Sequence, residues 1–272
     1  MSRRAIGCVP FLNAKPLIHY FSTPEAQGEV EVLFAPPSDL AEWVLDGRVD
    51  AALASSFLAL ERPGLRAAPG VSISSTGPVE SVRLFSKKPF DQVGVMALDR
   101  GSMTANHLAR ILLAEQFGAQ PGTFPAEPDM EAMLTRADAA VLIGDAGMDA
   151  PAEGLRVLDL GAEWDRMTGL PFVWALWIGT ESLTPELAHT LLKAKERGME
   201  RIEEVAKAES ERLGWAYSRC LRYLAEVIDF DLTERHLQGL RLFADLCAKY
   251  GFIAKSWTPE IVGEAAPAAK RQ

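Results

Sequence analysis

The stretch AIGCVPFLNAKPLIHYF, residues 5–21, decides the fold. Its first residues are small and apolar, which is typical of a buried strand, but Pro10 ends that strand almost at once. Pro16 stands where a helix can begin, because proline is tolerated in the first helical turn. We therefore expect a strand, a loop that presents Asn13 at the carboxyl end of the strand, and then a helix.

The same alternation continues as far as residue 55. EVEVLFA (29–35) alternates apolar and polar residues and predicts a strand. PSDLAEWVLDGRVD (37–50) predicts a helix that ends near Gly47, and AALAS (51–55) predicts a buried strand. The order β-α-β-α-β indicates a parallel sheet with helices on its faces.

A second α/β unit follows the first. SVRLFSKKPFDQVGVMALD (81–99) predicts two strands with a break at Lys87–Pro89, and RGSMTANHLARILLAEQFG (100–118) predicts a helix that Gly118 ends. MEAMLTRADAAVLIGDAGM (130–148) predicts a helix and an apolar strand. LPFVWALWIG (170–179) predicts a late strand, and from Thr184 onward the chain is mostly helical.

This order of elements indicates an α/β fold with two lobes around a central ligand cleft, joined by two crossover segments. We expect the crossings near residues 85–90 and 172–177. Lobe one would then comprise residues 1–88 and 175–265, and lobe two would comprise residues 89–174. The Ala- and Pro-rich end, residues 266–272, would be a disordered tail.

Composition excludes several classes of protein. The 272 residues carry a formal net charge of −9, so a nucleic-acid partner is not expected. No run of about 18 apolar residues predicts a membrane span, and the basic N-terminus lacks the apolar core of a signal peptide. We therefore expect a cytoplasmic protein, and the oligomeric state stays open.

Metal and cofactor signatures are missing from the sequence. The four histidines are scattered, no Cys/His cluster has metal-ligand spacing, and neither GxGxxG nor a P-loop pattern occurs. The widely spaced Cys8, Cys220 and Cys247 suggest reduced thiols. We therefore expect no metal and no organic cofactor.

Polar clusters directly follow predicted strands, where the cleft should lie. Free N–H groups and hydroxyls at a helix start suit a carboxylate or phosphate, although Ser102 could merely cap its helix. Asp145 could be a cap, a hinge residue or a ligand contact, Arg83 could clamp a carboxylate or lie on a solvated edge, and Trp174 could stack on a ligand or pack in the core. The candidate substrate-binding residues are Ser55, Ser56, Arg83, Gly101, Ser102, Thr104 and Asp145.

Five segments together resemble the chorismate dehydratase family of the futalosine route to menaquinone. They are IGCVPFLNAKPL, DGRVDAALASS, VESVRLFS, LDRGSMTANHLARILL and AAVLIGDAGM. VPFLNAKP is the most specific of them and separates this family from the dihydroxynaphthoate synthases of the same pathway. The resemblance covers about residues 5–178 and implies the type II periplasmic-binding-protein fold.

The resemblance implies that chorismate loses water to give 3-[(1-carboxyvinyl)oxy]benzoate, with aromatisation as the driving force and without a cofactor. For this reaction we expect Asn13 to be catalytic, since its amide can donate a hydrogen bond to the leaving oxygen and accept one from another group. The base would be a substrate carboxylate or a side chain such as Asp145. Ala105 departs from the family, which often has a hydroxyl residue there. A binding or sensing protein of the same fold, or a dihydroxynaphthoate synthase, remains the alternative.

Overall fold

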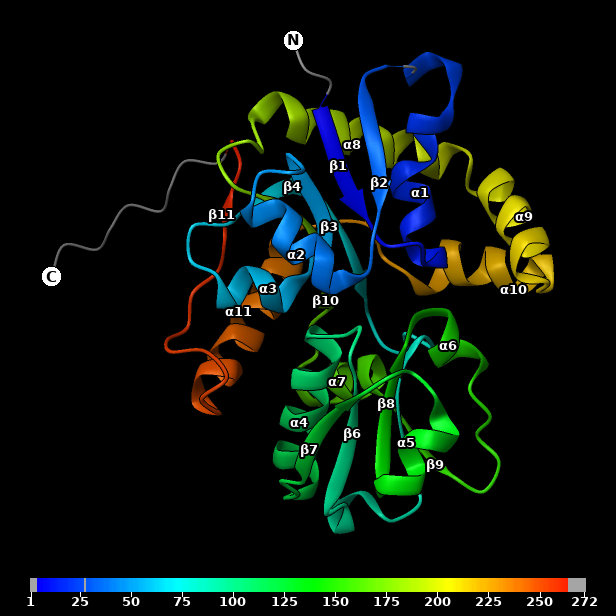
Figure 1. Cartoon of the computed structure of the whole chain (residues 1–272), viewed down its shortest axis with the longest axis vertical. Coiled ribbons are helices and arrows are strands. Elements are labelled where there is room, and N and C mark those ends of the chain that lie inside the picture. The colour runs from blue at the N-terminus through cyan, green and yellow to red at the C-terminus, as the bar shows by residue number, and fades with distance from the viewer. Residues whose placement is uncertain (1–3, 27, 264–272) are drawn as a thin grey trace, which may run out of the picture.

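A computed structural model of the chain describes residues 4–26 and 28–263. The strands of these residues form two sheets, one in each of two lobes that lie end to end along the long axis of the molecule (Figure 1). The first sheet has the strand order β11-β4-β10-β3-β1-β2, and the second has the order β7-β6-β8-β5-β9. The predicted two-lobed α/β architecture is confirmed.

The first sheet starts as the sequence predicts. Its first three strands are β1 (Arg4–Cys8), β2 (Val30–Phe34) and β3 (Ala51–Ser55). Both β2 and β3 pair parallel with β1, which lies between them. The connecting segments contain η1 (Leu12–Ala14), α1 (Lys15–Ile18), η2 (His19–Ser22), η3 (Pro24–Ala26) and α2 (Pro37–Leu45), and α3 (Ser56–Glu61) follows β3 directly.

Three further strands complete this sheet, and one of them, β10, runs antiparallel to both of its neighbours. They are β4 (Arg66–Ser75), β10 (Phe172–Gly179) and β11 (Glu260–Ile261). β10 pairs antiparallel with both β3 and β4, and β11 pairs parallel with β4. The sequence pattern did not predict β4, because Pro69 and Gly70 interrupt it. A register shift opposite them, between Leu176 and Ile178 of β10, accommodates the interruption.

The second lobe is a smaller mixed α/β unit. Its strands are β5 (Val82–Ser86), β6 (Val95–Asp99), β7 (Gly122–Ala126), β8 (Ala139–Ile143) and β9 (Arg156–Asp159). Its helical segments are η4 (Phe90–Gln92), α4 (Thr104–Phe117), α5 (Met130–Arg136), α6 (Gly144–Asp149) and α7 (Leu160–Thr168). β6 pairs parallel with β7 and β8, whereas β5 pairs antiparallel with β8 and β9.

The C-terminal third is helical, as predicted, and returns to the first lobe (Figure 1). Its helices are α8 (Pro185–Glu200), α9 (Ile202–Leu213), α10 (Tyr217–Arg222), the π-helix η5 (Tyr223–Val227) and α11 (Glu234–Lys249). α8 packs against α1 so closely that a Cβ on Gly198 would lie 1.7 Å from the carbonyl oxygen of Pro16. A glycine is therefore required at this crossing of two helices.

The crossings between the lobes lie earlier in the chain than expected. β5 belongs to the second sheet, so the first crossing comprises residues 76–81 and not residues 85–90. β10 belongs to the first sheet from Phe172 onward, so the chain has returned before residue 172. The break at Lys87–Pro89 is only a turn between two strands of one sheet, because a strand's sequence does not say which sheet it joins. The predicted tail at 266–272 lies outside the described residues.

Candidate active site

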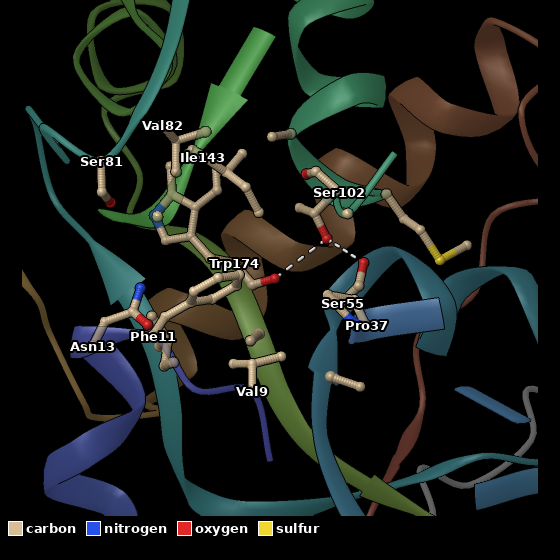
Figure 2. Close-up of a pocket in the computed structure, with 18 of the residues that line it drawn as sticks. Val9, Phe11, Asn13, Pro37, Ser55, Ser81, Val82, Ser102, Ile143 and Trp174 are labelled. Carbon is tan, nitrogen blue, oxygen red and sulfur yellow. Dashed lines mark hydrogen bonds between the residues drawn. The ribbon is translucent and has the colours of Figure 1, made fainter. Parts of the chain in front are cut away.

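A cavity that is partly open to solvent lies between the lobes. Its lining includes the carboxyl end of β3 and the segments that follow β1, β6 and β8, so it lies at the carboxyl ends of these strands. Figure 2 shows the labelled side chains around it. Five of the predicted site residues line this cavity together: Asn13, Ser55, Gly101, Ser102 and Thr104.

Thr104, the first residue of α4, joins the two lobes at one end of the cavity. Its Oγ1 lies 2.6 Å from Ser55 Oγ and 3.3 Å from Ser56 Oγ. It accepts a hydrogen bond from the Phe57 N–H at 3.2 Å and donates one to the Trp174 carbonyl at 3.2 Å. The Thr104 hydroxyl is therefore occupied by protein partners, and it holds the start of α4 against the first lobe.

The loop before α4 is held in place by its own residues. Asp99 Oδ1 accepts from the Gly101 N–H at 2.8 Å, and Asn106 Nδ2 donates to the carbonyls of Asp99, at 2.8 Å, and Ser102. Burial raises the pKa of the Asp99 carboxyl. This end of the cavity thus offers the Ser102 side chain and the first-turn N–H groups of α4, which suit an anion. Ala105 lines the cavity with a methyl group.

Asn13 and Ser81 form a second polar end of the cavity, and Tyr223 lies behind them. Asn13 Nδ2 donates to the Tyr223 hydroxyl at 3.4 Å, and that hydroxyl donates to Ser81 Oγ at 2.8 Å. Asn13 Oδ1 is buried and has no hydrogen-bond partner among the described residues. This amide oxygen is therefore available to accept a hydrogen bond from a ligand.

Apolar and aromatic side chains form the walls between the two polar ends. Phe11, Ile143 and Trp174 lie around the cavity in Figure 2. The indole N–H of Trp174 donates to Ser75 Oγ at 3.0 Å. β10 shifts register between Val173 and Ala175, so Trp174 lies at a bulge, a feature that can redirect a side chain into a site.

Ser56 and Arg83 do not line the cavity. Ser56 is buried behind it and donates to the Val173 carbonyl at 2.7 Å. Arg83 Nε donates to the carbonyl of Gly147 at 2.8 Å, and its Nη2 donates to that of Met148 at 3.0 Å. Partial burial lowers the pKa of the Arg83 guanidinium. Both side chains are engaged with the backbone and support the walls of the site.

Asp145 lies at the mouth of the cleft, in an adjoining cavity. Its Oδ1 accepts from the Leu12 N–H at 3.3 Å, and its Oδ2 lies 3.7 Å from Arg212 Nη2. Burial raises the pKa of the Asp145 carboxyl. The residue contacts the loop that carries Asn13, and it does not line the ligand cavity itself.

Sequence reasoning missed Ser81 and Tyr223 and favoured core packing for Trp174. Ser81 directly precedes β5, so a rule that looks at the carboxyl ends of strands does not find it. Tyr223 and Asn13 are 210 residues apart in the chain, so no local sequence pattern could pair them. For Trp174, no pattern could reveal that a bulge interrupts the alternation of the strand.

The described residues hold no group of three or more His, Cys, Asp or Glu side chains that could bind a metal ion. Over the same part of the chain, no helix has the length and apolar character needed to cross a membrane. The donor groups at the cavity are hydroxyls, amides and backbone N–H groups, which suit an organic anion better than a cation.

The solved structures that resemble this chain define its class. Protein AF1704 from Archaeoglobus fulgidus superposes with a TM-score of 0.71 at 18% identity, covering 92% of this chain and 98% of its own. The periplasmic aliphatic sulphonate binding protein SsuA from Escherichia coli gives a TM-score of 0.65 at 15% identity, covering 100% and 97%. The chain has the two-lobed fold of periplasmic binding proteins, with its candidate site between the lobes.

Sequence comparison then identifies the family. The model of the menaquinone biosynthesis family matches residues 4–249. A chorismate dehydratase from Thermus thermophilus is 32% identical over 260 residues, which cover 88% of this chain and 93% of that protein. The chain belongs to the menaquinone biosynthesis family.

Proposed function

We propose that the protein is a chorismate dehydratase, a carbon–oxygen lyase that converts chorismate to 3-[(1-carboxyvinyl)oxy]benzoate and water on the futalosine route to menaquinone. One observation carries the proposal beyond the family. The cavity has two polar ends separated by aromatic and aliphatic walls. Chorismate is a ring with two carboxylates and one hydroxyl, so it needs such an alternation of polar and apolar surface.

We place one carboxylate of chorismate at the end of the cavity near α4. Ser102 and the first-turn N–H groups of α4 can donate to it, with Ser55 beside them. The hydrogen of Ser55 can go either to Thr104 Oγ1, as the distance of 2.6 Å allows, or to a bound anion. In this proposal Ser56, Arg83 and Asp145 support the site without contacting the substrate.

The reaction removes a ring hydrogen as a proton and a ring hydroxyl with its electron pair, and together these leave as water. The new double bond makes the ring aromatic, and that gain supplies the driving force. The protein must bind the dicarboxylate, hold water away from the ring and stabilise the departing oxygen. We place this last task at the other polar end of the cavity, which Asn13 and Ser81 form.

We propose that the reaction takes place in the cytoplasm, and the unpaired cysteines support this proposal. Cys8, Cys220 and Cys247 are all buried, unpaired thiols. Burial raises the pKa of the Cys8 thiol to about 12, so the thiol stays neutral beside the cavity loop. Unpaired thiols are usual in a reducing compartment.

Incubation of the purified protein with chorismate tests the proposal. We expect chorismate to disappear and one aromatic dicarboxylate to appear, identified by mass and by ultraviolet absorbance. Tight binding of chorismate without turnover would instead indicate a sensing protein. Turnover of a cyclic futalosine derivative, with chorismate untouched, would indicate a dihydroxynaphthoate synthase.

The same assay tests the expected independence of metal ions. We expect turnover of chorismate to stay within about twofold after exhaustive treatment with a chelator, because hydroxyl and amide donors supply the polar contacts. The control adds Mg²⁺, Mn²⁺ or Zn²⁺ back to the treated protein. A loss of activity that one of these ions restores would contradict the expectation.

A further inference from the structure

Tyr223 is a buried hydroxyl directly behind the reaction site. It is the first residue of the π-helix η5 and has only 1% of its surface exposed. Its hydroxyl contacts two side chains of the cavity, Ser81 at 2.8 Å and Asn13 at 3.4 Å. π-helical turns often occur at functional sites. Through this side chain, the C-terminal third contacts two residues that line the cavity.

The direction of each hydrogen bond follows from the chemistry of the three groups. Asn13 Nδ2 can only donate, so the Tyr223 oxygen accepts from it, and the Tyr223 hydrogen goes to Ser81 Oγ. Burial raises the pKa of the Tyr223 phenol, so the phenol keeps this hydrogen at neutral pH. The Ser81 hydrogen is then left for the cavity, and so is Asn13 Oδ1, which has no partner among the described residues.

The backbone beside Ser81 is held in an unfavourable conformation. Glu80 has φ 62°, the only positive φ at a non-glycine residue among those the structure describes. Its N–H donates to Asp159 Oδ2 at 2.7 Å, and Arg222 donates to its two carboxylate oxygens at 2.7 and 2.6 Å. Consecutive residues of one segment, Arg222 and Tyr223, thus hold consecutive residues of the other, Glu80 and Ser81. Such strain persists only where surrounding contacts enforce it, and it is often found at functional sites.

We propose that Tyr223 is a positioning residue that makes Ser81 a donor and Asn13 an acceptor, so that the two form a subsite for a substrate hydroxyl. A donor and an acceptor side by side match an alcohol, which both accepts and donates, and they do not match a carboxylate, which only accepts. The inference rests on the proposed function for the identity of this group, the ring hydroxyl of chorismate.

In the reaction, the subsite would act on the bond that breaks. The electron pair of the carbon–oxygen bond leaves with the oxygen, and the Ser81 O–H donates to that oxygen as its negative charge grows. Tyr223 strengthens this donation, because a hydroxyl that accepts a hydrogen bond becomes a better donor. The proton lost from the ring balances the departing hydroxide as water.

The test compares Tyr223→Phe with the wild type for two ligands, chorismate and the product 3-[(1-carboxyvinyl)oxy]benzoate, which lacks the ring hydroxyl. We expect kcat/KM for chorismate to fall about tenfold or more, while the inhibition constant of the product stays within about twofold. The matched control is Tyr20→Phe, since Tyr20 is also buried and donates to Glu29 at 3.2 Å away from the cavity. It should behave as the wild type.

Two outcomes would overturn the proposal. One is unchanged turnover in Tyr223→Phe, and the other is equal weakening of both ligands with a lowered melting temperature, which a merely structural role predicts. If Tyr223→Phe does not fold, Ser81→Ala must show the same selective loss, or the proposal fails. If both variants fold, the double variant should have a kcat/KM for chorismate only slightly lower than that of Ser81→Ala alone, because Tyr223 acts through Ser81.

A failure of the proposed function is distinguishable from a failure of this inference. If the proposed function is wrong, the wild type binds chorismate without converting it. In that case the ratio of the dissociation constants of chorismate and product, measured by calorimetry, replaces kcat/KM. The inference requires that Tyr223→Phe changes this ratio in favour of the ligand without the hydroxyl.

Discussion

At the scale of single residues, Asn13 illustrates how a short sequence pattern places a functional group. Pro10 and Pro16 confine the loop after β1, and the short helix η1 that contains Asn13 follows from that confinement. The Asn13 side chain donates to Tyr223 and not to its own backbone. A residue that merely completed a turn would bond locally, so this contact favours a role in the cavity.

We expect Asn13→Ala to lower kcat for chorismate by about 10²–10³, with a smaller effect on substrate affinity. The reason is that Asn13 Oδ1 orients the departing hydroxyl toward the Ser81 donor as the bond breaks, whereas binding depends mainly on the carboxylates. The measurement takes melting temperature, chorismate affinity and turnover on the same preparation. Near-normal turnover per folded molecule, with a lowered melting temperature, would remove Asn13 from the active site.

The predicted site residues show where sequence reasoning succeeds and where it stops. Residues that directly follow parallel strands, such as Ser55 and Ser102, reach the cavity because the fold brings strand ends together. Arg83 lies within a strand, and its partners, the carbonyls of Gly147 and Met148, come from a helix more than 60 residues away. Such long-range contacts leave no trace in local sequence patterns.

At the scale of elements, regular strands were predictable and interrupted ones were not. β1, β2 and β3 are short, apolar and followed by turn signals, and their pairing is as predicted. β4 contains a proline and a glycine, and it is a strand because it pairs with β10 and β11. β5 was recognised as a strand but assigned to the wrong lobe, because pairing partners are chosen by tertiary packing.

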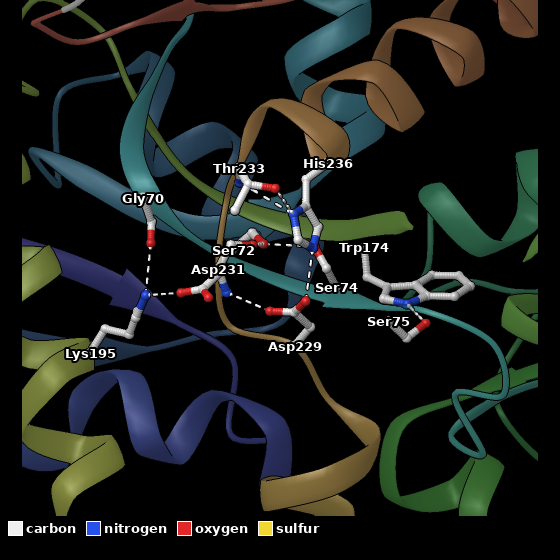
Figure 3. A network of polar contacts seen from close by, with 10 residues as sticks. All are labelled: Gly70, Ser72, Ser74, Ser75, Trp174, Lys195, Asp229, Asp231, Thr233 and His236. Atoms are coloured by element: carbon white, nitrogen blue, oxygen red, sulfur yellow. Dashed lines mark hydrogen bonds and ion pairs between the residues drawn. The ribbon is translucent and has the colours of Figure 1, made fainter. Parts of the chain in front are cut away.

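A polar network ties the start of α11 to the first sheet and reaches the wall of the cavity (Figure 3). The Thr233 N–H donates to His236 Nδ1 at 3.2 Å, so His236 Nε2 carries the hydrogen and donates to Asp229 Oδ2 at 3.1 Å. Asp229 also exchanges two backbone hydrogen bonds with Ser74 of β4. The next residue, Ser75, accepts from the indole of Trp174.

We expect His236→Ala to reduce the free energy of unfolding by about 2–3 kcal/mol, because it removes a buried ring together with its hydrogen bonds and opens a gap. Chemical denaturation at neutral pH measures this. His189→Ala is the matched control, since His189 lies exposed on α8 and its variant should stay within about 0.5 kcal/mol of the wild type. Equal stability of the two variants would show that the network contributes little.

At the scale of the whole molecule, two contacts cross the cleft from helix starts of the second lobe. Thr104 of α4 meets Ser55 of β3, and Asp145 of α6 meets Leu12 after β1. Opening the cleft to admit a ligand breaks both contacts. Their strength therefore sets part of the balance between open and closed arrangements of the lobes.

Asp145 makes the stability of the folded protein dependent on pH. Burial raises the pKa of its carboxyl, while Arg212 and Lys15 lower it and Glu209 raises it. The folded protein thus holds the Asp145 proton more tightly than the unfolded chain. The stability that this gives is present below the ordinary pKa of about 3.9 and is lost as the pH rises through the folded value.

We expect Asp145→Asn to become more stable relative to the wild type as the pH rises from about 4 to 7, because asparagine never ionises and still accepts from Leu12. Urea denaturation of both proteins across this pH range measures the difference between their free energies of unfolding. Asp138→Asn is the control of opposite sign: the Lys88 hydrogen bond lowers the pKa of Asp138, so the wild type should lose stability against that variant as the pH falls.

The turnover of chorismate by Asp145→Asn should remain within about tenfold of the wild-type value, because Asp145 does not line the ligand cavity. A loss of about 10²–10⁴ without unfolding would instead assign proton transfer to this carboxylate.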